Sequence, residues 1–514
     1  MTLPLRLADP RPSYLVVLSL LLLVAMAASA WIARPLFLSL GVVGLVLTGY
    51  LAYHWPRTML VMSALAVLAD PVLVPAVLPS SMTFGPIGIS EPMLLATSLV
   101  ITYRGLRHGT FWHALRDPVV GMVILFVAVA VVSAFVNATP ALVAGLGIVM
   151  TIDAIAVYVV ARMLPFDQRG VAVAVGAIVG VAAAASVLGI AQVVLHPDLL
   201  GFASFAGRFG EGGRITSFLG NPNMVAAVVG FVLPFPILAA QRLPEVRHRR
   251  AAFALATLFC LALLLTFSRG AWVAVALGML VGLMLLSRRA LLILLMAVVA
   301  AWAISVVLPR NLLVSQEDLA LYFPQSGAPS IIDSTLDRLD EVYEKRDLRM
   351  RFIREGLPVV LDNPVLGVGP GRYGGAAATI TDSPVYAAYG TGLYGFRTVH
   401  NFWLHMTGEL GAIGVAVFLT LVVGLVIRFV HAARRELDPM RFILMGGSAT
   451  ALVVVAFNNL TEMVFEGNFP GFVIWLVLGM VSTLAPSAPI LWGRVSRSSI
   501  GGASSKAPEA PAEG

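Results

Sequence analysis

Residues 118–136 read PVVGMVILFVAVAVVSAFV and contain no charged side chain. A helix needs about 20 predominantly apolar residues to cross the hydrocarbon core of a bilayer. The stretch has that length and composition, so it predicts a membrane-spanning helix. The rest of the chain decides whether this helix is an isolated anchor or one span among many.

Runs of the same kind recur along the whole chain. Hydrophobic residues make up 59% of the sequence and charged residues 12%, against about 25% charged residues in soluble domains. We predict an all-α polytopic membrane protein with about fourteen transmembrane helices. The predicted spans, of which the second and fourth are the weakest, cover residues 14–33, 36–53, 58–78, 88–103, 118–136, 141–163, 170–195, 222–240, 251–268, 270–287, 290–308, 400–429, 442–460 and 469–486.

The first predicted span resembles a signal peptide. Arg6 and Arg11 precede its apolar run, which ends in small residues. Because another hydrophobic run follows within a few residues, we interpret this segment as an uncleaved first helix.

Arginine positions predict which helix ends face the cytoplasm, because cytoplasmic loops are enriched in Arg and Lys. With the N-terminus inside, the short outer loops hold only Arg34, Arg208 and Arg214. The predicted inner loops hold Arg57, Arg104, Arg107, Arg116, Arg162, Arg169, Arg242, Arg247, Arg249, Arg250, Arg288, Arg289, Arg428, Arg434, Arg435, Arg441, Arg494, Arg497 and Lys506. The alternation predicts that both termini are cytoplasmic. It also explains the net charge of +7 without a nucleic-acid partner.

Residues 309–398 interrupt the pattern with a long, mostly polar segment on the predicted outer face. Long loops translocate regardless of charge, so the arginines in this loop do not contradict that side. Within the loop, residues 334–357 predict an amphipathic helix with apolar positions on one side: Leu336, Leu339, Val342 and Tyr343.

The chain therefore divides into six predicted regions. They are a cytoplasmic N-terminus (1–13), N-terminal transmembrane helices (14–195), further transmembrane helices (196–308), the large extracytoplasmic loop (309–398), C-terminal transmembrane helices (399–486) and a cytoplasmic tail (487–514). The tail has the composition of a disordered end.

Two spans begin on the outer face next to unusual polar groups. Asn221 and Pro222 have the pattern of a helix cap, and Arg214 before them is either a solvated loop arginine or an anion contact. Arg269 lies in a tight turn between two apolar runs, and an arginine inside the membrane costs roughly 2.5–3.5 kcal/mol on insertion scales. Arg269 either snorkels to lipid headgroups or binds an anion. The positive potential of the adjacent helix N-terminus favours the anion site.

The twelfth span opens with His400 and Asn401, in the stretch HNFWLHMTGELGAIG (400–414). His400 is either a polar cap at the membrane interface or a catalytic base, because histidine titrates near neutral pH. His405 lies on a different helix face, so the two histidines do not predict a metal pair. Glu409 is one turn beyond His405 and could pair with it in a structural or supporting role.

Glycines dominate residues 363–374, where Gly369, Gly371 and Gly374 match G-x-G-x-x-G. No strand–helix unit surrounds the match, so we interpret it as tight turns that need positive φ rather than as a nucleotide site. Arg372 within it is a further candidate for anion contact. The single Cys260 cannot form an internal disulfide.

Four motifs together resemble the O-antigen ligase and polymerase family of bacterial membrane glycosyltransferases. They are GNPN at 220–223, TFSRGA at 266–271, NPVLGVGPGRY at 363–373 and the histidine stretch at 400–414, in the family's order. The resemblance covers roughly residues 210–480 and implies a GT-C-like fold. The family has about a dozen spans, so the additional N-terminal helices have no assigned role.

The resemblance implies inverting transfer of a glycan from an undecaprenyl-pyrophosphate donor to an acceptor hydroxyl. The reaction would take place at the outer face of the bacterial cytoplasmic membrane, without a metal, a nucleotide or another cofactor. His400 matches the family's essential histidine, and three arginines would contact the pyrophosphate: Arg269, Arg214 and Arg372. Possible supporting residues are Asn401, Asn221, Asn223, Ser268, Arg351, Arg354 and Glu409.

The acceptor and the class of function stay open at this point. A lipid-linked core, a protein hydroxyl or another repeat unit could accept the glycan, so both ligase and polymerase fit. The competing hypothesis is a transporter or flippase for a lipid-linked glycan. Transporters contain internal repeats and place ionisable groups at the membrane midplane. Here the unusual polar residues gather at the outer surface, which favours the enzyme.

Overall fold

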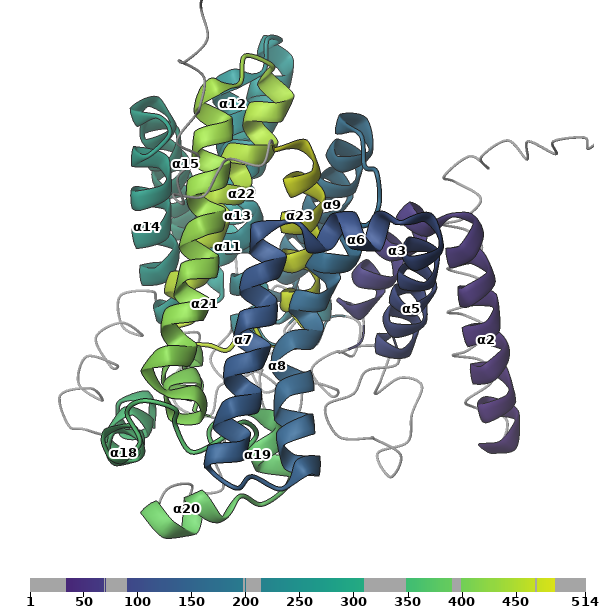
Figure 1. The fold of residues 1–514 in the computed structure, drawn as a ribbon. Helices are drawn as coiled ribbons and strands as arrows, with labels where there is room; N and C mark the ends of the chain where they lie inside the picture. Colours follow the sequence, from purple (N-terminus) through teal and green to yellow (C-terminus); the bar gives the residue numbers. More distant parts are fainter. Residues whose placement is uncertain are drawn as a thin grey trace, which may run out of the picture.

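The computed structural model describes residues 34–68, 70, 90–196, 199, 214–308, 348–390, 399–466 and 469–485. Every regular element in these ranges is a helix (Figure 1). In chain order they are α2 (Arg34–His54), α3 (Pro56–Val67), α5 (Glu91–His108), α6 (Thr110–Leu115), α7 (Pro118–Val136), α8 (Ala141–Arg162), α9 (Gln168–Val194), the 3-10 helix η3 (Ser217–Leu219), α11 (Pro222–Val232), α12 (Pro234–Arg242), α13 (Val246–Leu265), α14 (Arg269–Met284), α15 (Arg288–Val307), α18 (Leu348–Asp362), α19 (Ala376–Ile380), α20 (Pro384–Tyr389), α21 (Phe402–Arg435), α22 (Pro439–Asn458) and α23 (Phe469–Leu484).

The predicted all-helical membrane fold is confirmed over the described residues. Eight of their helices are long and apolar enough to cross a membrane, and three shorter apolar helices accompany them: Pro56–Val67, Arg269–Met284 and Pro470–Leu484. The predicted span at 222–240 consists of α11 and α12, which meet at Leu233. The predicted span at 14–33 and most of the predicted amphipathic helix at 334–357 lie outside the described residues. The total of about fourteen spans stays a prediction.

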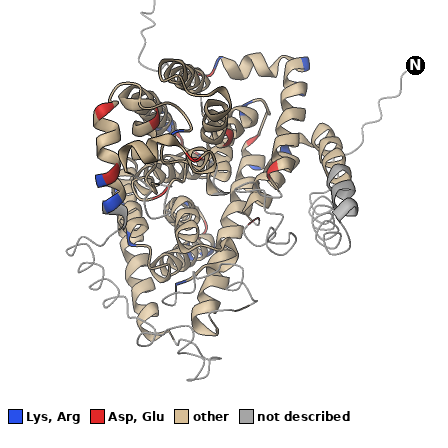
Figure 2. Cartoon of the chain, turned by 90° about the horizontal axis from the view of Figure 1, so that it is seen from below, with Lys and Arg blue, Asp and Glu red and all other residues tan. Residues whose placement is uncertain are grey.

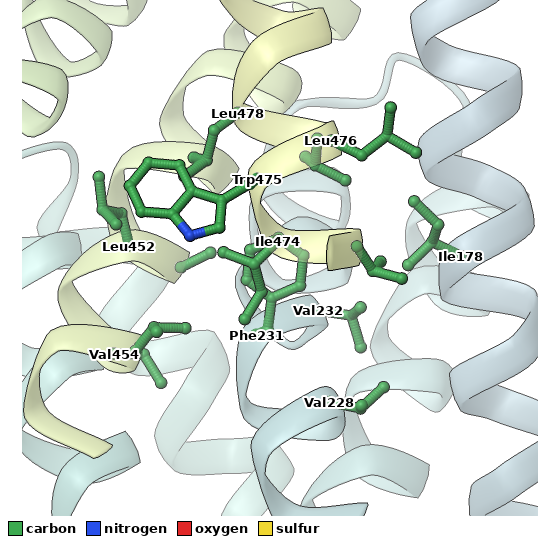
Figure 3. Packing of buried hydrophobic residues seen from close by; sticks show 14 of the residues in the cluster. Ile178, Val228, Phe231, Val232, Leu452, Val454, Ile474, Trp475, Leu476 and Leu478 are labelled. Atoms are coloured by element: carbon green, nitrogen blue, oxygen red, sulfur yellow. The ribbon is translucent and has the colours of Figure 1, made fainter. Parts of the chain in front are cut away.

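α22 and the α11–α12 pair form the centre of the bundle. In each of them 78% of the most apolar window is buried inside the protein, against 22% for α15. Phe231, Leu452 and Trp475 belong to one buried cluster where α11, α22 and α23 meet (Figure 3). A Cβ added to Gly278 of α14 would collide with the backbone of Val454 on α22. Such close approach at small residues is typical of helix packing in membranes.

The two ends of the bundle differ in composition. Arginines stand at the end where α8, α12 and α21 finish and α15 begins: Arg162, Arg242, Arg435 and Arg288. The short helices α18, α19 and α20, from the predicted large loop, lie at the opposite end (Figure 1). Figure 2 shows the chain from that end, with basic residues in blue, acidic residues in red and all other described residues in tan. This arrangement agrees with the alternation of arginines along the sequence.

A buried ion cluster joins four helices at the basic end. Asp117, the N-cap of α7, accepts hydrogen bonds from Arg428 Nη1 of α21 at 2.9 and 3.1 Å. Its carboxylate also lies 2.9 Å from Nε of Arg162 on α8. Arg428 Nη2 donates to the carbonyls of Ser482 (3.1 Å) and Ala485 (3.2 Å), at the end of α23. One side chain therefore fixes the end of α23 against α7 and α21.

Removal of Arg428 is expected to destabilise the fold strongly. Arg428→Ala leaves buried carbonyls without their donor and removes one of the two guanidiniums at Asp117, and breaking a buried ion pair typically costs about 3–5 kcal/mol. Thermal unfolding of the purified protein in detergent measures the effect. Arg435→Ala, exposed near the end of the same helix, is the matched control. An equal loss in the two variants would contradict a structural role for the cluster.

Candidate active site

α21 is broken at Gly411, where φ is +63° and ψ is −165°. Glycine adopts this conformation readily, and other residues are strained in it. The break leaves carbonyls at the end of the first half of α21, and N–H groups at the start of the second half, without helical partners. Inside a membrane such groups must find partners within the protein.

The segment 364–369 of the glycine-rich motif supplies these partners. Four backbone hydrogen bonds join it to the break, from Val368 N to Gly408 O (2.8 Å), Gly369 N to Glu409 O (3.0 Å), Ala412 N to Pro364 O (2.8 Å) and Ile413 N to Val365 O (3.3 Å). A Cβ added to Gly367 would collide with the backbone of Glu409, so glycine is required for the contact. The glycine-rich motif is therefore part of the helix architecture.

The glycine motif also turns sharply as it crosses the end of the bundle. Gly369, Gly371 and Gly374 have φ values of +104°, +75° and +79°, which confirms the interpretation of this motif as turns that need positive φ. A Cβ added to Gly147 of α8 would collide with the backbone of Gly371. The loop is therefore seated directly on α8 as well as on α21.

The side chains of Glu409 and His405 contact the backbone of this loop. The buried Glu409 carboxylate accepts from the backbone N–H groups of Gly371 (2.8 Å) and Tyr373 (3.0 Å). His405 Nδ1 lies 2.6 Å from the carbonyl oxygen of Tyr373 and 4.0 Å from Glu409. Its Nε2 faces Glu466 at 3.5 Å, and burial raises the pKa of Glu466 to about 8. We predicted that His405 and Glu409 could pair with each other. Their shortest contacts are instead with the backbone of the loop.

A separate polar network lies at the loop end of the bundle and contains His400. Its Nδ1 lies 3.8 Å from Oε2 of the buried Glu462, which follows α22. The other carboxylate oxygen of Glu462 accepts from Asn223 Nδ2 at 2.7 Å. Asn223 Oδ1 in turn accepts from Ser268 Oγ (2.9 Å) and Arg214 Nη2 (3.2 Å). Residues from the GNPN, TFSRGA and histidine motifs therefore meet through one carboxylate.

Helix caps fix the positions of this network. Asn221 Oδ1 accepts from the Asn223 N–H at 2.8 Å and caps α11, and Asn401 Oδ1 accepts from the Leu404 N–H at 2.9 Å and caps α21. The capping expected of Asn221 is confirmed. The Asn401 amide oxygen is therefore engaged in a helix cap. The side chain that faces Nδ1 of His400 is the carboxylate of Glu462.

Backbone strain accompanies the site. His400 and Phe267 have φ values of +48° and +50°, a region that non-glycine residues rarely adopt. Each residue directly precedes a helix cap, Asn401 and Ser268 respectively. Such strained residues persist where the surrounding structure fixes them, and they cluster at functional sites.

The remaining candidate arginines have different surroundings. Arg269 is the first residue of α14 and directly follows Ser268 of the network, which agrees with the predicted tight turn. Arg372 Nη1 donates to the carbonyls of Asn137 (3.1 Å) and Val368 (3.4 Å) near the α7–α8 turn. On α18, Arg351 Nε donates to Glu355 at 2.7 Å and Arg354 is exposed. Anion contact by Arg372, Arg351 and Arg354 stays a prediction.

Glu462 is the residue that the sequence reasoning missed. It is one of several acidic residues near the ends of predicted spans, and no motif marks it. The available signal is its position just after the asparagine pair Asn458–Asn459, where the apolar run of α22 ends. A carboxylate at that depth needs a partner inside the protein.

Three of the four sequence motifs also lie within a match to a known protein family. Residues 251–419 match the family model described as O-antigen ligase. This part of a chain whose described residues form an all-helical fold, with eight helices long and apolar enough to cross a membrane, is therefore similar to O-antigen ligases. The match includes Arg269, the glycine motif and His400, and it confirms the resemblance drawn from the sequence. A search of curated proteins found no match to the chain.

Proposed function

We propose that this O-antigen ligase-like protein transfers a glycan from an undecaprenyl-pyrophosphate donor to an acceptor hydroxyl. The proposed site faces the outside of the bacterial cytoplasmic membrane. The observation that carries the proposal is the network of His400, Glu462, Asn223, Ser268 and Arg214. It combines a candidate base with a carboxylate partner and a guanidinium group at one end of the bundle.

In the proposed reaction the acceptor oxygen bonds to the anomeric carbon while the bond from that carbon to the pyrophosphate oxygen breaks. Attack opposite the leaving group inverts the configuration. His400 takes the hydroxyl proton, and the Glu462 carboxylate stabilises the imidazolium that forms. The leaving pyrophosphate keeps the electron pair, and Arg269 and Arg214 balance its charge.

Reconstitution tests the proposal. The full chain in proteoliposomes, given a lipid-linked glycan and an acceptor, is expected to release undecaprenyl pyrophosphate and to form the glycosylated acceptor. We expect the reaction to persist in the presence of a chelator, since the proposed step uses no metal. Movement of the donor across the bilayer without pyrophosphate release would support the transporter instead. In a deletion strain, the length of the missing glycan separates polymerase from ligase.

The proposed sidedness predicts a labelling pattern. In a Cys260→Ser background, a membrane-impermeant thiol reagent is expected to label Gln325→Cys in intact spheroplasts. Arg249→Cys, in the first turn of α13 at the opposite basic end, is expected to react only after the membrane is opened. The reverse pattern would overturn the orientation while leaving the fold unchanged.

Glu462 provides a sharper test of the network. Glu462→Gln keeps an oxygen that can accept from Asn223 but removes the negative charge that faces His400. We expect turnover to fall about tenfold or more, with the substrate KM changed less, because the charge acts on the proton-transfer step. The control is Glu245→Gln, which changes an exposed carboxylate at the basic end. Turnover of Glu462→Gln at the control level would remove Glu462 from the proposed mechanism.

A further inference from the structure

α18 lies across the bundle and does not run along it. In Figure 1 the spanning helices run vertically and α18 is seen nearly end-on, level with the lower turns of α7 and α8. One face of α18 is buried against the glycine-rich motif. On this face Phe352 and Val359 share a buried cluster with Val368 and Tyr373. The Phe352 ring lies 6.0 Å from that of His400. This face fixes α18 beside the candidate site.

The two remaining flanks of α18 have opposite character. Successive residues of a helix are about 100° apart, so Ile353, Leu357 and Leu361 form one flank beside the buried face. They are 38%, 49% and 66% exposed. Charged residues occupy the other flank: Arg351, Glu355 and Asp362. Arg354, seven residues before Leu361, lies at the edge between the two flanks. α18 therefore has a buried face, an exposed apolar flank and a charged flank.

The apolar flank continues into the exposed apolar surface of α21. Beyond Leu361 the chain reaches Val365, which is 57% exposed, and the carbonyl of Val365 accepts from the N–H of Ile413 at 3.3 Å. Ile413 is 41% exposed at the start of the second half of α21. The exposed apolar side chains thus run from α18 to a helix that is long and apolar enough to cross the membrane.

We propose that α18 lies in the interface of the membrane leaflet on the side of the large loop, with its apolar flank among lipid acyl chains. A helix with one apolar and one charged flank, parallel to the membrane plane, is the form of an interfacial helix. The charged flank then faces the aqueous side, and Arg354, at the edge between the two flanks, can reach lipid phosphates. The partner is the bilayer itself, and the inference does not depend on the transfer reaction proposed above.

Spin labelling tests the depth of α18. Nitroxides on Ile353→Cys, Leu357→Cys, Leu361→Cys and Asp362→Cys, in the Cys260→Ser chain, are reconstituted in vesicles of phosphatidylethanolamine and phosphatidylglycerol. We expect the three apolar-flank labels to collide more with dissolved oxygen than with a water-soluble nickel complex. The label at position 362, on the charged flank, is expected to show the reverse. Ala387→Cys, exposed on α20 farther from the bundle, is the aqueous reference.

Three labelled positions report on the same flank, so loss of one variant leaves two. Nickel accessibility on this flank equal to that at Ala387 would show that it faces water and would overturn the proposal. Low accessibility to both reagents would show that protein, from this chain or a second copy, covers the flank, and would also overturn it. Neither result affects the proposed transfer reaction, because the measurement does not use activity.

Discussion

His400→Ala is expected to lower turnover about 10²–10⁴-fold, the usual contribution of a general base, while the protein still inserts and binds its donor. The imidazole is half-exposed at the loop end of the bundle and its Nδ1 faces the buried Glu462. A proton on Nδ1 directed at this carboxylate leaves Nε2 as the basic atom. Turnover in proteoliposomes, with donor binding measured in parallel, checks the prediction.

Glutamine at position 400 separates two roles of this residue. His400→Gln keeps hydrogen bonding but cannot accept a proton at working pH, so a base role predicts a loss close to that of His400→Ala. Near-wild-type turnover would refute the base and leave His400 as a residue that positions the acceptor. His405→Ala provides the comparison inside the same helix. It removes the contact with the Tyr373 carbonyl under the loop, so its main effect should be lower thermal stability.

Hydrophobic runs and capping patterns were enough to predict much of the fold. Apolar length predicts a spanning helix whatever its neighbours are, and Asn221 followed by Pro222 predicts the start of α11 from local chemistry alone. The glycine positions predicted turns for the same reason, since positive φ is a local requirement. These features depend on residues that are close together in the sequence.

The break at Gly411 and the role of Glu462 could not be predicted in this way. Gly411 stands inside an apolar run that predicts one continuous helix, and its break is stable because a loop some 45 residues earlier supplies the missing hydrogen bonds. The partners of Glu462 are Asn223 and His400, which are distant from it in the sequence. Both features arise from tertiary contacts that no local pattern records.

Arg269→Ala is expected to lower turnover about 10²–10³-fold, the loss typical for removal of one donor that stabilises developing negative charge. Arg269 opens α14, where the helix N-terminus adds positive potential. Its neighbour Ser268 bonds to Asn223, so Arg269 directly follows a member of the network that contains His400. Arg269→Lys keeps the charge but loses the bidentate geometry that suits a phosphate, so its turnover should lie between those of Ala and wild type.

Two controls make the Arg269 result decisive. Arg435→Ala removes an exposed arginine from the basic end of the bundle and is expected to leave turnover unchanged. Accessibility of a thiol at position 325 verifies that each variant inserts in the same orientation. If Arg269→Ala inserts normally and turns over as fast as Arg435→Ala, the arginine does not contact the pyrophosphate. If Arg269→Ala loses turnover while Arg269→Lys turns over as fast as the wild type, a positive charge suffices and bidentate contact is not used.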